Sequence, residues 1–103
     1  DRRVLTMKIT GVKVRKLSDN EKMKAIVSVT FDDEIVIHDI KVIYNEGRLF
    51  VAMPSRRTSE GKYLDIAHPI NGTVREYLET EVLNAYRQAS SEMMEQRTPA
   101  EEL

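Results

Sequence analysis

Length, composition and charge limit this chain to one small folded domain. It has 103 residues, of which 41% are hydrophobic and 32% charged, so disorder of the whole chain is not expected. The absence of cysteine excludes disulfides, thiolate metal sites and a cysteine nucleophile, and it fits a cytoplasmic location. No apolar run approaches the roughly 18 residues of a membrane helix, so we expect no membrane partner.

The net charge of −1 hides an uneven distribution. Taken as a whole it argues against a nucleic-acid binder, because such domains are usually basic. Residues 1–62, however, carry 13 basic and 9 acidic side chains, whereas residues 63–103 carry 3 basic and 8 acidic ones. Any site for a negatively charged partner is therefore expected in the first part of the chain.

Alternating apolar residues predict two strands near the N-terminus. Residues 1–6 precede Met7, which resembles a native start, and are interpreted as an N-terminal extension or an added remnant. The strand over residues 7–17 needs a bulge near Gly11 to keep its apolar residues on one face. Residues 23–31 alternate most clearly, and Asp32-Asp33 is short enough for a tight hairpin to the next strand.

Three further strands are predicted after this hairpin. Residues 34–44 are β-branched and apolar at both parities, which is typical of a central strand covered on both faces. Residues 49–53 form a short apolar strand that ends at Pro54. A polar loop over Pro54–Lys62 then leads to a short fifth strand over residues 63–67.

The C-terminal part predicts one amphipathic helix from Thr73 to about Ser91, with Asn71 or Thr73 as N-cap. Its apolar residues follow helical spacing on one face: Val74, Tyr77, Leu78, Val82, Ala85, Tyr86 and Ala89. The domain is therefore expected to span residues 7–91. Residues 92–103 are expected to form an acidic, flexible tail.

This order of elements predicts an α+β fold. Short connections imply an antiparallel meander of about five strands with the C-terminal helix packed on one face. One helix cannot cover both faces of the strand over residues 34–44. The apolar residues of this strand that face away from the helix therefore need another partner, which suggests a homodimer.

Few residues are candidates for catalysis or metal binding. His38-Asp39 and the pair Asp65 and His68 could form a metal site if their segments meet, but His38 and Asp39 should point to opposite faces of a strand. Hydrogen-bonded structural roles explain the same residues. With no phosphate-cradling glycine loop and no hydrolase or metalloprotease motif, we expect no enzyme activity, cofactor or small-molecule substrate.

The polar loop is the more informative segment. Arg56 and Arg57 are adjacent and flanked by hydroxyls of Ser55 and Thr58, and arginine forks bind phosphate oxygens bidentately. A solvated hairpin loop explains the same composition. A second basic set lies around the first hairpin and includes Lys13, Arg15, Lys16 and Lys24.

Several stretches are similar to the SpoVG family (stage V sporulation protein G), over residues 7 to about 86. They are Val12-Lys13-Val14-Arg15, Ile37-His38-Asp39-Ile40-Lys41-Val42-Ile43, Leu49-Phe50-Val51-Ala52-Met53-Pro54-Ser55-Arg56-Arg57-Thr58 and Asp65-Ile66-Ala67-His68-Pro69-Ile70-Asn71. The resemblance implies a small cytoplasmic bacterial dimer with an antiparallel sheet and a C-terminal helix. It also implies a regulator of sporulation, septation and gene expression that binds DNA and RNA, with the binding loop at Arg56 and Arg57.

We therefore expect a nucleic-acid-binding regulator in which Arg56 and Arg57 contact phosphates. Ser55 and Thr58 would add neutral contacts, and the second basic set would give weaker support. The alternative is a protein-interaction module in cell division or regulation. A small metalloenzyme that uses the two His–Asp pairs is the third possibility.

Overall fold

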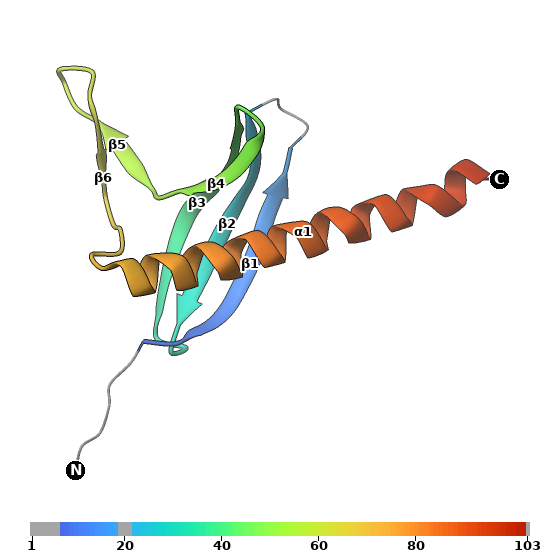
Figure 1. Cartoon of the computed structure of the whole chain (residues 1–103), viewed down its shortest axis with the longest axis horizontal. Helices are drawn as coiled ribbons and strands as arrows, with labels where there is room; N and C mark the ends of the chain where they lie inside the picture. The colour runs from blue at the N-terminus through green and yellow to red at the C-terminus, as the bar shows by residue number, and fades with distance from the viewer. Residues whose placement is uncertain (1–6, 19–21, 103) are drawn as a thin grey trace, which may run out of the picture.

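The structure, a computed structural model, describes residues 7–18 and 22–102, with side chains described as far as residue 92. Four antiparallel strands form the main sheet in chain order: β1 (Ile9–Leu17), β2 (Met23–Phe31), β3 (Ile35–Asn45) and β4 (Arg48–Ala52). This confirms the predicted antiparallel meander, with β3 inside the sheet and β1 and β4 at its edges (Figure 1).

The predicted fifth strand does not join this sheet. Strand β6 (Tyr63–Asp65) instead pairs with β5 (Ser55–Arg57), and the two form a separate ribbon that projects from the body of the molecule (Figure 1). The predicted polar loop over Pro54–Lys62 is therefore a strand, β5, at its start and a loop only from Thr58 onward. Ser55–Arg57 becomes a strand because it pairs with Tyr63–Asp65. Its own polar composition does not predict a strand.

Two of the predicted local features are present in the sheet. The pairing of β1 with β2 shifts register between Ile9 and Gly11, which is the bulge expected there. At the first hairpin, Asp32 and Asp33 have φ angles of 56° and 55°, and the Glu34 N–H donates to the Phe31 carbonyl at 2.9 Å. Two consecutive left-handed residues define the tight turn that matches strand twist, and aspartate tolerates this conformation.

The core lies between one sheet face and helix α1 (Gly72–Glu102), which crosses that face in Figure 1. The alternating residues of β2 are buried as predicted, together with Leu78 and Val82 of the helix. The core cluster consists of Ala25, Val27, Val29, Phe31, Ile40, Val42, Val51, Met53, Leu78 and Val82. The opposite sheet face, which α1 does not cover, is called the open face below.

Helix α1 begins and packs as predicted but ends later. The Asn71 side-chain oxygen accepts the Val74 N–H at 2.8 Å, so Asn71 is the N-cap. The Tyr77 hydroxyl accepts the Ile9 N–H at 3.0 Å and ties the helix to the start of β1. The helix continues past Ser91 to Glu102 and runs beyond the edge of the sheet (Figure 1). Strong helix formers follow Ser91, although the apolar stripe used to predict the helix has ended there.

Within the described ranges, no helical segment combines the length and hydrophobicity needed to cross a membrane.

Candidate nucleic-acid interface

The ribbon formed by residues 54–66 is a continuous hydrogen-bonded unit. At its base the Ile66 N–H donates to the Pro54 carbonyl at 2.7 Å, and near its tip the Thr58 N–H donates to the Lys62 carbonyl at 2.7 Å. Pro54 is buried, so the ribbon leaves the body at a fixed point. Arg56 and Arg57 therefore stand on a paired structure rather than on a loose loop.

The ribbon tip is a three-residue turn organised by Thr58. Its carbonyl accepts the Gly61 N–H at 3.0 Å, and its Oγ1 accepts the N–H groups of Glu60 and Lys62 at 3.3 and 3.2 Å. Gly61 has a φ of 86°, the left-handed position that such turns require. The Thr58 oxygen predicted to contact a ligand is thus engaged by backbone donors, and its hydroxyl hydrogen is the group that can still be donated.

The two arginines lie on opposite faces of the ribbon. Arg56 pairs with Leu64 and Arg57 pairs with Tyr63 across the strands, and neighbouring residues of a strand point to opposite sides. Both arginines are exposed, as is Ser55, whose partner is Asp65. The two arginines are adjacent in the sequence, but the strand pairing directs their side chains to opposite faces of the ribbon.

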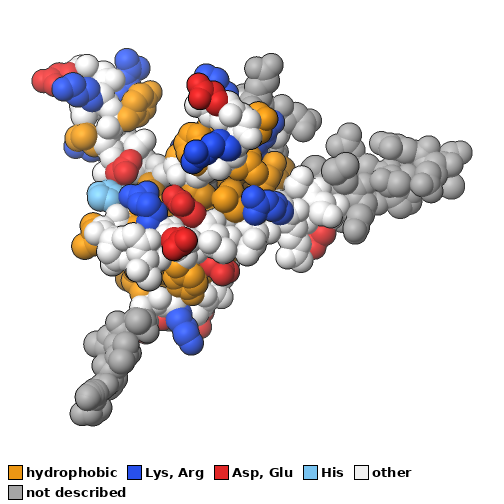
Figure 2. Space-filling model, in the orientation of Figure 1, with side chains coloured by type: hydrophobic (Ala, Val, Ile, Leu, Met, Phe, Trp, Pro, Cys, Tyr) orange, Lys and Arg blue, Asp and Glu red, His pale blue; other side chains and the backbone are white. Residues whose placement is uncertain are grey.

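The ribbon is basic at its tip and apolar along its length. It holds three basic residues, Arg56, Arg57 and Lys62, against Glu60 and Asp65. Figure 2 shows basic and acidic side chains together at its outer end and hydrophobic side chains below them. Tyr63 is 70% exposed and Ile66 65% exposed, values that are unusual for large apolar side chains.

The open face carries a second group of basic residues. Lys13 and Lys16 of β1 lie opposite Ser28 and Ile26, which alternate with the core residues of β2. Lys41 lies between buried Ile40 and Val42 and therefore also faces this side. Lys41 and the ribbon residue Lys62 were missed from the sequence. Strict alternation around Ile40 and Val42 could have indicated the position of Lys41.

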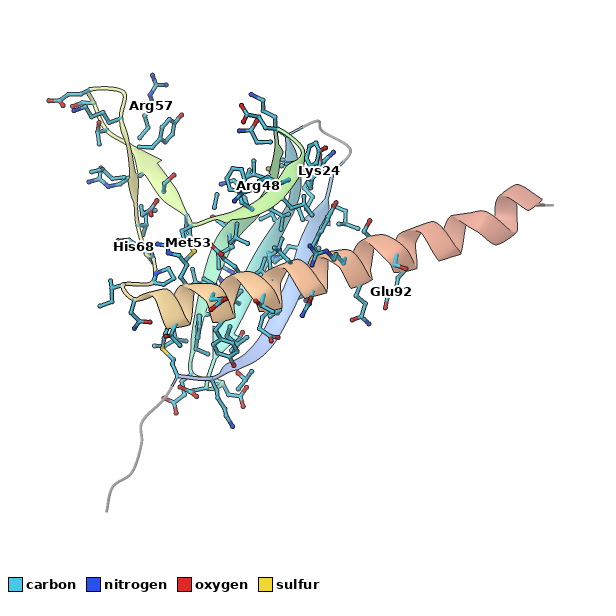
Figure 3. The ribbon with its side chains drawn as sticks, in the orientation of Figure 1. Lys24, Arg48, Met53, Arg57, His68 and Glu92 are labelled. Carbon is cyan, nitrogen blue, oxygen red and sulfur yellow. The ribbon has the colours of Figure 1, made fainter. Side chains whose placement is uncertain are left out.

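Lys24 does not belong to this group. It is half-buried, and its Nζ lies 5.6 Å from the centroid of the Tyr44 ring. Tyr44 pairs with Leu49, which packs against the core, so the Lys24 side chain lies on the helix side. Lys24 and Arg48 lie at the same end of the sheet in Figure 3. Lys24 therefore lies apart from Lys13 and Lys16, because a shift in strand pairing next to Lys24 breaks the simple alternation.

The two His–Asp pairs stay apart. His38 and Asp39 line a hollow on the open face with Ser28, whereas His68 lines a small apolar cavity with Leu78 on the helix side. Among the described residues, no group of three or more histidines and carboxylates is placed to hold a metal ion. Contrary to the sequence expectation, His38 and Asp39 line the same hollow, because a bulge interrupts β3 at this point.

Fold and surface together define a small α+β domain with a basic projecting ribbon and a basic open sheet face. The chain belongs to the SpoVG family, whose model matches residues 7–88. Among similar proteins described as "Putative septation protein SpoVG", that of Caldanaerobacter subterraneus subsp. tengcongensis is 59% identical over 83 residues, covering 81% of this chain and 91% of that protein. The protein of Clostridium beijerinckii is 57% identical over 86 residues (84% and 94%), and that of Heliobacterium modesticaldum is 60% identical over 83 residues (81% and 93%).

Proposed function

We propose that this chain is a non-enzymatic bacterial regulator that binds DNA or RNA through the ribbon of a homodimer. The observation that carries the proposal is the projecting, hydrogen-bonded ribbon with an exposed arginine on each face. A guanidinium fork matches two phosphate oxygens, and a paired ribbon holds that fork at less entropic cost than a mobile loop.

The opposed arginines suggest how a strand would be held. One face of the ribbon would direct Arg56 to one phosphate while the other directs Arg57 to a second. A ribbon lying between two stretches of backbone meets both requirements, and a two-stranded ribbon also fits the major groove of duplex DNA. Contacts of this kind give affinity and salt dependence with little sequence preference.

The homodimer is supported by exposed apolar side chains at the base of the ribbon and at the β4 edge of the sheet. Ile66 is exposed at the base of the ribbon, and Phe50 of β4 is exposed on the open face beside its partner Ile43. A second copy that covered such residues would bring two ribbons to one nucleic acid and raise the avidity without a new type of contact. Sedimentation at micromolar concentration should give twice the 11.9 kDa chain mass, and a single 11.9 kDa species would contradict the dimer.

The cellular role follows from the family. The relatives are named for septation, and we propose that this chain acts in septation and related control of gene expression in the bacterial cytoplasm. We propose neither a catalytic role nor a metal for it. The role in sporulation implied by the resemblance is part of the same proposal.

Electrophoretic mobility shift tests the ribbon directly. Arg56→Ala combined with Arg57→Ala should abolish the shift of random single- and double-stranded oligonucleotides, with a melting temperature close to wild type because both side chains are exposed. The matched control is Arg75→Ala combined with Arg87→Ala, which removes the same charge from exposed positions on α1. An equal loss in the control variant would reject the ribbon assignment.

The exposed apolar side chains of the ribbon favour one alternative, a protein-interaction module. In that case Tyr63 and Ile66 would enter a partner while the arginines meet acidic side chains. No mobility shift by the wild-type protein at about 50 mM salt, where phosphate contacts are strong, would favour this alternative.

A further inference from the structure

A bulge in β3 creates a site that the proposed ribbon interface does not use. Val27 pairs with Ile40 and Val29 pairs with Ile37, so His38 and Asp39 together lie opposite the single residue Ser28. Asp39 has a φ of 63°, a left-handed conformation that is uncommon inside a strand. Bulges of this kind re-aim side chains and occur next to functional sites.

The bulge fixes the His38 ring. Ser28 is only 6% exposed although it faces the side that the helix does not cover, and its Oγ lies 2.8 Å from His38 Nδ1. If the Ser28 hydroxyl donates to Nδ1, the neutral ring carries its proton on Nε2. The Nε2–H donor then lies on the exposed side of the ring, and the hydrogen bond between Nδ1 and Ser28 fixes the orientation of the ring.

The open-face hollow is lined by five residues, Arg15, Ile26, Ser28, His38 and Asp39, and has a volume of about 420 Å³. That volume lies within the range of about 300–1,000 Å³ typical of small-molecule sites. Among the residues that the structure describes, Arg15 and Asp39 form no ion pair, so both charges are available to a ligand.

The lining does not suit a simple anion. Arg15 and the Nε2–H of His38 are donors for phosphate oxygens, but the Asp39 carboxylate is an acceptor that repels an isolated phosphate. A ligand that joins a phosphate to a donor group satisfies both. A nucleotide has these parts, since it carries ribose hydroxyls or exocyclic amines, and its base could lie against Ile26.

We propose that the open-face hollow binds one nucleotide unit, with Arg15 and His38 on its phosphate and Asp39 on a hydroxyl or amine of the same nucleotide. This inference deepens the proposed function and rests on it. The exposed Lys13 and Lys16 on the same face would attract the neighbouring phosphates of a strand. The same chemistry would accept a free nucleotide or one unit of a bound strand.

Chemical-shift titration of the full ¹⁵N-labelled chain with adenosine 5′-monophosphate, and separately with inorganic phosphate, tests the hollow. Asp39→Gly removes the carboxylate but keeps a backbone that accepts positive φ. It should weaken binding of the nucleotide about threefold to tenfold and strengthen binding of inorganic phosphate. Asp33→Gly, at another exposed and left-handed position that does not line the hollow, should change neither.

His38→Asn provides a second variant, because the asparagine amide can still reach Ser28 while the Nε2 donor is lost. It should weaken nucleotide binding about threefold to tenfold, and His68→Asn on the helix side should not. The proposal is overturned if the nucleotide leaves the amides of residues 15, 26, 28, 38 and 39 unshifted, or if Asp39→Gly strengthens binding of nucleotide and phosphate alike.

A hexamer of oligoadenylate separates the two ligand sources and the two proposals. Weaker hexamer binding by His38→Asn indicates one unit of a strand, whereas an effect confined to the mononucleotide indicates a free nucleotide. Both outcomes support nucleotide binding in the open-face hollow. Wild-type protein that binds the mononucleotide but not the hexamer would reject the ribbon function and keep the hollow. Hexamer binding that depends on Arg56 and Arg57, together with mononucleotide binding that His38→Asn leaves unchanged, would do the reverse.

Discussion

Salt dependence offers a quantitative test of the ribbon. Each arginine that neutralises a phosphate contributes about −0.7 to the slope of log affinity against log salt on a single strand, and about −0.9 on duplex. A dimer with both Arg56 and Arg57 on each ribbon would give slopes of about −2.8 and −3.6. Raising salt from about 50 to about 200 mM would then weaken single-strand binding about 50-fold and duplex binding about 150-fold.

The opposed positions of the two arginines sharpen this expectation. Because Arg56 and Arg57 lie on different faces of the ribbon, each single substitution to alanine should remove its own phosphate contacts and leave those of its neighbour. In the dimer, either variant should reduce the magnitude of the single-strand slope by about 1.4. Fluorescence anisotropy of labelled oligonucleotides over a salt series measures both slopes.

Two results would refute this reasoning. An unchanged slope in both single variants would mean that neither arginine neutralises a phosphate. A slope change of the same size in Arg75→Ala combined with Arg87→Ala would mean that overall charge, not the ribbon, determines binding.

Three further substitutions test the fold that supports the ribbon. Leu78→Ala should lower the free energy of unfolding by about 2–5 kcal/mol in urea titration, because Leu78 is buried between helix and sheet; a loss below about 1 kcal/mol would contradict the packing. Asn71→Ala should cost about 0.5–2 kcal/mol in the same assay by removing the helix cap, whereas an unchanged value would reject the cap. Gly61→Ala should strain the ribbon tip by about 1–2 kcal/mol and weaken oligonucleotide binding while α1 keeps its helical circular dichroism; wild-type affinity would argue against a fixed ribbon.

Local sequence patterns predicted most of the domain body. The alternation in β2 identified its buried face, and the Asp32-Asp33 hairpin followed from the short spacing between two strands. The helix was recognised by its apolar stripe, and its continuation to Glu102 was missed because the stripe ends before the helix does. These features depend on neighbours in sequence, which is why periodicity predicts them.

The candidate site was less predictable, because it depends on pairing between segments. Ser55–Arg57 has no strand pattern and becomes β5 only through its register with Tyr63–Asp65. That register, absent from local sequence, separates Arg56 from Arg57. At His38 and Asp39 the period of two fails, since the bulge with a left-handed Asp39 turns both residues toward one hollow.

The most direct test of nucleic-acid binding by the ribbon is a map of the binding surface on the intact chain. Titration of ¹⁵N-labelled protein with a single-stranded oligonucleotide should shift the amides of residues 55–65 first and most strongly, followed by those of the open sheet face. Shifts confined to α1, or no shifts at low salt, would contradict the account.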